Sequence, residues 1–405
     1  MTTRSTAPSL DHRSRVLDDV EPLTLDQLVD EIGAAATRAN GDLAAHAQAA
    51  LGLPPLVLTV GDASCTVDRG RIDRGARPGA VLHVDPGALA DLVAGVRSTY
   101  GLVFLGGGRP ENDSFREVLA WDHVLQAFFD GRPLHEPGAL HFVAPDGSEL
   151  SFDQTFGPDD DDAAIGHFLA EAGFCRLRGW IDPALLPAIE SEVQAAARSS
   201  QPEEPDRWWA TLQDGSTRCV RVMRLLDSAP HMAELAHGEV FARLQRLFDD
   251  GHEFRADEPQ SSEGLIKPLD VASGLSEFPW HRDCSMGGHH FRCAGYAVGL
   301  PLTVTGADAG YLRVMPGSHR VSTPAPGLFD GFDPGLPVLP VETEPGDLTI
   351  HVSCILHGTK APKTVERVVT YTTYSLPYLG GRGAAAAPRP ELRDAMVSAA
   401  RGPSS

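Results

Sequence analysis

The chain has 405 residues, of which 42% are hydrophobic and 22% charged, as is usual for a folded protein of two or three domains. Its 34 basic and 55 acidic residues give a formal net charge of −21, which disfavours nucleic acid and anionic membranes as partners. Apolar stretches fall short of the roughly 20 residues of a membrane helix. Residues 1–15 lack the apolar centre of a secretory signal, and the six cysteines form no CxxC pair. We therefore expect a reduced, cytoplasmic protein without a disulfide framework.

The first third of the chain predicts a small α+β domain over residues 23–137, preceded by a flexible arm at residues 1–22. Asp85 and Pro86 form a typical helix start, with an N-cap residue followed by proline in the first turn. Helices are also predicted from Thr24 and over the aromatic segment between Phe115 and Phe129. Three short strands are predicted at Leu56–Val60, Ala63–Val67 and Ala80–Val84.

Three motifs in this region resemble the sterol-carrier-protein-2 (SCP2) family. They are LVLTVGDASCTVDRG, AVLHVDPGALADLVAG and the closing aromatic helix. The resemblance implies an SCP2-like domain that can enclose an apolar tunnel. An ordinary apolar core explains the same residues equally well, so both interpretations stay open. No catalytic group of residues stands out in this region.

The second half of the chain begins after a predicted linker at residues 138–162. A helix ending at Gly173, a strand at Phe174–Leu177 and a helix start at Asp182-Pro183 follow. Further strands are predicted at Ala294–Val304, Tyr311–Val314, Leu348–Val352 and Val365–Tyr374. Strands punctuated by Gly/Pro-rich loops indicate a jelly-roll or cupin-like barrel with flanking helices over residues 163–380, followed by a C-terminal tail at 381–405.

A possible metal site lies in this barrel. His281 and Asp283, in WHRD, stand two residues apart, so on a strand they point to the same face while Arg282 points away. His357 lies in a later segment of predicted strands. Two imidazoles and one carboxylate are typical of non-haem Fe(II) oxygenases and leave positions open for a co-substrate and O₂. Arg367 has a planar guanidinium that can hold an acidic co-substrate.

Several segments resemble the phytanoyl-CoA dioxygenase family, in the family's order, over roughly residues 160–380. They are FLAEAGFCRLRGWIDPALLPAIESEV, WHRD, GYLRVMPGSHR and GDLTIHVSCILHGT. The resemblance implies a double-stranded β-helix enzyme that uses Fe(II), 2-oxoglutarate and O₂. The roles it implies are iron binding by His281, Asp283 and His357, and 2-oxoglutarate binding by Arg367, Thr359 and Lys267.

The expected reaction is oxidation of a small, mostly apolar metabolite, as in natural-product biosynthesis. Related halogenases have Gly or Ala at the position of Asp283, so its carboxylate favours oxygenation. Hydroxylation is expected, and desaturation, epoxidation or cyclisation would use the same residues. Two alternatives are a lipid carrier with a non-catalytic barrel and a zinc hydrolase with the same ligands, for which no general base is evident.

Three further histidines have no assigned role. His289 and His290 follow the first two ligands and are expected to lie in a solvated loop. The alternation of the strand at Leu348–Val352 does not decide which face His351 occupies.

Overall fold

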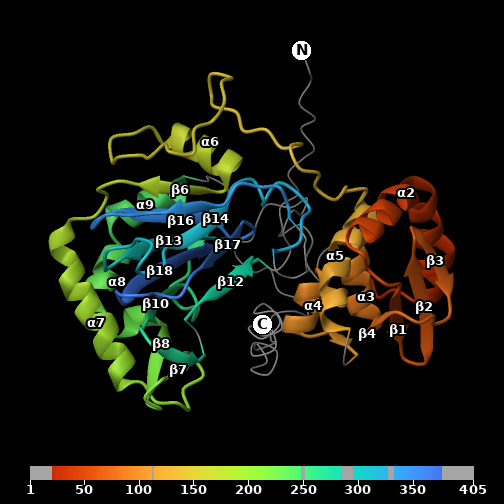
Figure 1. Cartoon of the computed structure of the whole chain (residues 1–405), viewed down its shortest axis with the longest axis horizontal. Helices are drawn as coiled ribbons and strands as arrows, with labels where there is room; N and C mark the ends of the chain where they lie inside the picture. The colour runs from red at the N-terminus through yellow and green to blue at the C-terminus, as the bar shows by residue number, and fades with distance from the viewer. Residues whose placement is uncertain are drawn as a thin grey trace.

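The computed structural model describes residues 21–95, 97–111, 114–247, 251–274, 276–284, 295–326 and 333–375. The predicted tail, all but two residues of the predicted arm, and His289 and His290 lie outside these ranges. Within them, no helix is both long and apolar enough to cross a membrane. Two parts lie next to each other in Figure 1, the first with the red and orange elements and the second with the yellow to blue elements.

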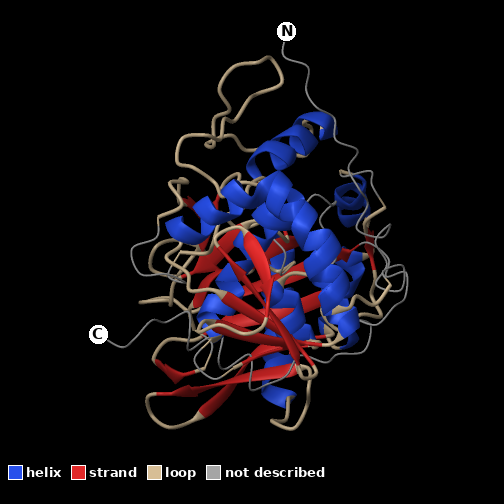
Figure 2. Cartoon of the chain, turned by 90° about the vertical axis from the view of Figure 1, so that its right-hand side faces the viewer, coloured by secondary structure: helices blue, strands red, loops and turns tan. Residues whose placement is uncertain are grey.

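The first part is one sheet with helices against it. Its strands are ordered β3-β2-β1-β4-β5, with β1 and β4 parallel and the other neighbours antiparallel. Figure 2 shows the molecule with this part toward the viewer, its helices in blue and its strands in red. The elements are α1 (Leu25–Gln27), the π-helical turn η3 (Leu28–Gly33), α2 (Ala34–Ala50), β1 (Leu56–Val60), β2 (Ala63–Asp68), β3 (Arg71–Arg74), β4 (Ala80–Val84), α3 (Pro86–Val93), α4 (Thr99–Leu105), β5 (Gly108–Pro110) and α5 (Phe115–Asp130).

Local capping chemistry explains where the helices of this part begin. The Asp85 carboxylate accepts a hydrogen bond from the Ala88 amide at the start of α3, which confirms the predicted N-cap. Thr24 and Gln27 form a reciprocal capping box at α1. The prediction of only three strands was wrong, because β3 and β5 were missed. Both are short, and their Arg, Asp, Gly and Pro residues give no apolar alternation.

The second part is a pair of sheets with helices along one side. Its elements are α6 (Asp162–Ala172), β6 (Phe174–Leu177), the 3₁₀ turn η4 (Pro183–Leu185), α7 (Leu186–Ser199), β7 (Arg207–Leu212), β8 (Thr217–Met223), the 3₁₀ turn η5 (Leu225–Asp227), α8 (Pro230–Ala236), α9 (Glu239–Arg246), β9 (Glu253–Phe254), β10 (Ser262–Lys267), β11 (Val271–Ser273), β12 (Phe278–His281), β13 (Gly295–Pro301), β14 (Leu312–Met315), β15 (Leu339–Val341), β16 (Leu348–Val352), β17 (Leu356–Thr359) and β18 (Arg367–Ser375).

The two sheets are antiparallel, in keeping with the predicted jelly-roll fold. The major sheet has the order β11-β7-β8-β10-β18-β13-β16-β6, with β9 on β18, and the minor sheet has the order β12-β17-β14-β15. Side chains cross between the sheets: the Lys267 Nζ of β10 donates to the Thr359 Oγ1 of β17 at 2.7 Å. The sheets therefore face each other, and we call the facing side of the major sheet its inner face.

The outer face of the major sheet packs against helices. Tyr296 and Tyr374 donate hydrogen bonds to the carbonyls of Leu244 and Phe241 in α9. On β10, a Cβ at Gly264 would lie 2.8 Å from a methyl carbon of Val193 in α7, so glycine permits close contact there. The large apolar core of the second part lies between this face and helices α6 to α9.

The segment predicted as a linker, residues 138–162, packs against the second part. Leu150 and Phe156 are buried in its core, and the Phe156 carbonyl accepts a hydrogen bond from the Trp180 indole. The predicted cap at Gly173 is confirmed, since this residue ends α6 in the left-handed conformation with φ of 82°.

Candidate metal centre

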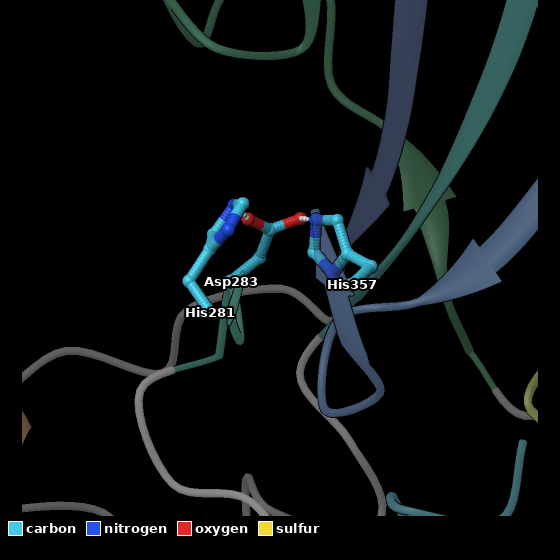
Figure 3. Close-up of side chains that lie close together, drawn as sticks. All are labelled: His281, Asp283 and His357. Carbon is cyan, nitrogen blue, oxygen red and sulfur yellow. Dashed lines mark ion pairs between the residues drawn. The ribbon is translucent and has the colours of Figure 1, made fainter. Parts of the chain in front are cut away.

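Three side chains meet at one end of the minor sheet. Two come from one short stretch, and the third is remote in the sequence. His281 ends β12 and His357 lies in β17, where the two residues are direct register partners. Asp283 places its carboxylate between the two imidazoles (Figure 3). Its two oxygens lie 3.5 Å from His281 Nε2 and 3.6 Å from His357 Nε2. One donor atom from each residue can be chosen so that all three lie within 4.8 Å of one another, as a shared metal ion requires.

Backbone carbonyls orient both imidazoles toward this point. His281 Nδ1 lies 2.7 Å from the Pro279 carbonyl oxygen, and His357 Nδ1 lies 3.1 Å from that of Ile355. Because a carbonyl only accepts, each Nδ1 carries the proton and each Nε2 has a free lone pair. This tautomer is the one that binds a metal through Nε2, with the second nitrogen fixing the ring.

The sequence-based geometry of the first two ligands was partly wrong. Strand β12 ends at His281, so Asp283 lies in the turn after the strand and not two residues along it. The pairing of β12 with β17 is also irregular between Phe278 and His281. Arg282 does point away from the ligands, and its guanidinium donates to backbone carbonyls, among them that of Cys354 at 3.0 Å.

The charges of the cluster prepare it for a cation. Burial alone would raise the pKa of Asp283, but the adjacent imidazoles of His357, His281 and His351 hold this pKa well below its usual value. Burial, and then the adjacent His281 imidazole, lower the pKa of His357 to about 3, so this imidazole is neutral at pH 7. A carboxylate and a neutral imidazole are therefore ready at pH 7. Among the described residues, the Asp283 side chain keeps 43% of its surface exposed.

The three residues expected to bind the co-substrate lie together on the inner side. Lys267 and Arg367 are direct register partners on β10 and β18, and Lys267 donates to Thr359. Lys267 also donates to the Lys360 carbonyl, and Arg367 donates to the Gly310 carbonyl at 3.1 Å. Only 3% of each of the two basic residues is exposed.

These two buried basic residues provide a test of whether an acidic co-substrate fits. Among the described residues, no carboxylate forms an ion pair with Lys267 or Arg367, and Arg367 Nε is buried without a hydrogen-bond partner. Burial, then the charge of Arg367, lowers the pKa of Lys267 to about 6. A buried arginine without an anion is costly, and a carboxylate would satisfy the charge of Arg367 and its unused donor and would favour the charged form of Lys267. The residues present therefore fit a dicarboxylate such as 2-oxoglutarate beside the metal ligands.

Three inner-face residues, Tyr371, Glu263 and Arg221, were not singled out from the sequence. Tyr371 lies four residues after Arg367 on β18, and Glu263 lies four before Lys267 on β10, so strand alternation places each on the inner face. Glu263 forms a buried ion pair with Arg221 of β8, whose guanidinium lies 4.2 Å from the Trp208 ring centroid. Strand alternation counted from Arg367 and Lys267 could have found Tyr371 and Glu263.

The structure answers the open question about His351. This residue lies on the inner face of β16, with Nε2 3.7 Å from the second Asp283 oxygen and its ring centroid 4.5 Å from that of His357. Only 2% of the residue is exposed, and its Nδ1 has no hydrogen-bond partner. A third imidazole thus adjoins the ligand cluster.

Three solved structures are each similar to the chain over more than half of its length. AviO1 from Streptomyces viridochromogenes Tue57 is 23% identical, with a TM-score of 0.42 over 57% of this chain and 98% of that one. EctD from S. alaskensis, solved with 2-oxoglutarate and 5-hydroxyectoine, is 17% identical, with a TM-score of 0.43 over 64% and 92%. The epimerase SnoN from nogalamycin biosynthesis is 19% identical, with a TM-score of 0.40 over 56% and 93%. No curated protein sequence matches the chain.

The family comparison agrees with the geometry. The model for phytanoyl-CoA dioxygenase (PhyH) matches residues 169–367, a range that includes all six predicted site residues. Fe(II), 2-oxoglutarate and O₂ are the cofactor and co-substrates that the ligand cluster and the adjoining cations fit. Residues 169–367 therefore form a domain that matches the phytanoyl-CoA dioxygenase family.

Proposed function

We propose that the second part of the chain, residues 163–380, is an Fe(II)- and 2-oxoglutarate-dependent oxygenase that hydroxylates a small metabolite. The observation that carries the proposal is the convergence of three ligand side chains beside two buried basic residues, Lys267 and Arg367, that form no ion pair with a carboxylate among the described residues. The donor set alone would suit several metals. The two basic residues also indicate an acidic co-substrate. A zinc hydrolase or a lipid carrier needs no such co-substrate.

Each residue has a distinct task in this proposal. His281, Asp283 and His357 would hold the iron. Arg367 would bind a carboxylate of 2-oxoglutarate, for which its planar guanidinium is suited, and Lys267 and Thr359 would bind beside it. When bound, iron with 2-oxoglutarate and O₂ supplies the oxidant that removes a hydrogen atom from the substrate. The protein fixes the geometry and limits access of water.

The inner face also bears on the substrate. Leu265 and Val369 are register partners on this face and give it apolar surface, as a mostly apolar substrate requires. Nearby, the buried Glu263–Arg221 pair offers hydrogen-bonding groups. We propose a small, mostly apolar metabolite that carries at least one polar group, made in natural-product biosynthesis in the cytoplasm. Desaturation, epoxidation or cyclisation would use the same residues.

For the first part of the chain we propose an SCP2-like domain. Support comes from its mixed five-stranded sheet and from an apolar core in which Trp121, Val124 and Phe128 of α5 are fully buried. Binding of a fluorescent fatty acid to the purified protein tests the apolar tunnel. A protein that binds none, although its metal centre is intact, would leave this part with a structural role.

Anaerobic titration with Fe(II) and then 2-oxoglutarate tests the oxygenase. We expect one iron per chain, a weak visible absorption band when both are present, and succinate formation after O₂ is admitted. Asp283→Ala should lose the band and the succinate, because one of three ligands is gone. The exposed Asp153→Ala is the matched control and should behave as wild type. Stoichiometric zinc with O₂-independent hydrolysis, or binding of lipid without iron, would reject the proposal.

A further inference from the structure

A short segment after β14 lies between the first part of the chain and the metal centre. We call residues 318–323 the bridging segment. Three of its six residues are buried, with exposed fractions of 0% for Ser318, 1% for Ser322 and 0% for Thr323. Polar groups hidden to this degree must be satisfied inside the protein, so their partners show what the segment connects.

On one side, the bridging segment is bound by α5 and the residues that follow it. His123 Nδ1 lies 2.9 Å from the Ser322 Oγ, and the His135 amide donates to the Ser322 carbonyl at 2.8 Å. The Arg132 guanidinium donates to the Arg320 carbonyl at 2.9 Å. Three residues of the first part thus hold two residues of the segment. In Figure 1, α5 lies on the side of the first part that faces β12 and β17.

On the other side, the same segment holds the neighbours of the metal ligands. Arg282 stands between the first two ligands in the sequence. It donates through Nη2 to the carbonyls of Ser318 at 3.2 Å and Thr323 at 3.0 Å, and through Nε to that of Cys354 at 3.0 Å. Leu356 directly precedes the third ligand, and its amide donates to the Ser318 Oγ at 2.7 Å. Both ligand-bearing stretches are therefore fastened to one segment.

The hydrogen bonds on both sides of the bridging segment should stay the same near neutral pH. Burial, and then the charges of Arg282 and Arg132, lower the pKa of His123 to about 3, so its imidazole stays neutral. The planar guanidinium of Arg282 reaches three carbonyls from one fixed orientation, which a flexible lysine does not reproduce. The buried carbonyls of the segment would lose satisfied hydrogen bonds if either side moved.

We propose that the first part of the chain positions the metal ligands, acting from α5 through the bridging segment and Arg282. His123 and Arg282 are positioning residues, since neither bonds to the metal site directly. The inference rests on the proposed function, because it assumes that His281, Asp283 and His357 bind a metal. It differs from a role as a lid or a substrate carrier, because it acts on metal affinity with no substrate present.

The experiment measures Mn²⁺ affinity of the full chain from the free-ion electron paramagnetic resonance signal, without substrate or O₂. His123→Ala and Ser322→Ala should each weaken binding about 2- to 10-fold, the effect of losing one buried hydrogen bond. Arg282→Lys, which loses several contacts beside two ligands, should weaken it about 10- to 100-fold. Ser322→Ala removes a single oxygen, so it remains informative if His123→Ala does not fold.

His83→Ala is the matched control, because it removes a partly exposed imidazole from the same part of the chain, away from the bridging segment. It should leave Mn²⁺ affinity unchanged. In the double variant Ser322→Ala/Arg282→Lys, the two losses should be less than multiplicative, because both act through one path. Thermal unfolding of each variant checks that it is folded.

Two results would overturn the inference: unchanged Mn²⁺ affinity in folded Ser322→Ala and Arg282→Lys, or an equal loss in His83→Ala. Fully multiplicative losses in the double variant would also count against a shared path. Wild-type protein that binds no Mn²⁺ or Fe(II) would instead reject the proposed function itself. The two failures are therefore distinguishable.

Discussion

The two faces of the major sheet differ sharply, although the same strands make both. On β18 and β10, the outer face carries Val368 and Ile266, which lie in the apolar core, and the inner face carries Arg367 and Lys267. Neighbouring residues on one strand thus have different roles: one packs in the core, and the next faces the candidate site. Because side chains alternate along a strand, one sheet can give stability on one side and a reactive site on the other. Substitutions on the two faces should therefore have separable effects.

The largest expected effect is on the outer face. Ile350 is fully buried in the core beneath the helices, and Ile350→Ala should lower the free energy of unfolding by about 2–5 kcal/mol. Ile350→Val should cost about 0.5–1.5 kcal/mol. Urea unfolding measures both. Metal affinity of the folded Val variant should equal that of wild type, although the next residue, His351, adjoins the ligand cluster. A change in the metal affinity of Ile350→Val would show that the two faces do not have separate roles.

The inner face should show the reverse pattern at Arg367. Arg367→Met removes a buried cation with an unused donor, so 2-oxoglutarate binding should weaken by about 1.5–3 kcal/mol, roughly 10- to 100-fold. Stability should be unchanged or higher, because an unpaired buried charge is lost. The measurements are the KM for 2-oxoglutarate and urea unfolding. A large loss of stability with an unchanged KM would show that this arginine serves packing instead.

The pattern of β18 also shows what the sequence could predict. A strand was predicted at Val365–Tyr374 and is observed at Arg367–Ser375, and Leu348–Val352 was predicted with its observed bounds. Long apolar alternation gives a strong signal in both cases. The His281, Asp283 and His357 set came from residue types and family motifs, and the structure brings the three together.

Other features depend on contacts that are remote in sequence. Asp283 was expected on a strand, but β12 ends at His281, and where a strand ends is decided by its partner β17. The face of His351 follows from its pairing with Ala297, which the local sequence does not reveal. The bridging segment contacts α5 across almost 200 residues, and no periodicity encodes such a contact.

A smaller effect concerns protons at Lys267. Its pKa is lowered to about 6 by burial, so without a co-substrate this amine is mostly neutral at pH 7.5. A bound carboxylate favours the charged form and raises the pKa, so binding should take up as much as one proton. The affinity for 2-oxoglutarate should therefore fall as the pH rises above 6. Calorimetry of Mn²⁺-loaded protein in two buffers of different ionisation enthalpy measures the uptake.

Lys267→Met is the control for this proton uptake. It should abolish the uptake and flatten the pH dependence of 2-oxoglutarate affinity. Saturating Mn²⁺ keeps the ligand imidazoles deprotonated, so their titration does not contribute. Uptake that persists in Lys267→Met would assign the proton to another group.

The smallest effects come from two tyrosines of β18 that lie on opposite faces. The Tyr371 hydroxyl on the inner face is 3.5 Å from Arg367 Nη2, a long and weak contact. Tyr371→Phe should raise the KM for 2-oxoglutarate only about 2- to 5-fold and leave the free energy of unfolding nearly unchanged. Tyr374 on the outer face donates to the Phe241 carbonyl at 2.8 Å. Tyr374→Phe should cost about 1 kcal/mol of stability and leave the KM unchanged.

This pair removes the same atom from the same strand, so neither residue type nor strand explains a difference between the two variants. Only the face differs. If Tyr371→Phe lost stability and Tyr374→Phe raised the KM, the two faces would not divide packing from chemistry as β18 indicates. If each variant changed only its own quantity, the division would hold even for a single oxygen atom, which is the finest test that this strand allows.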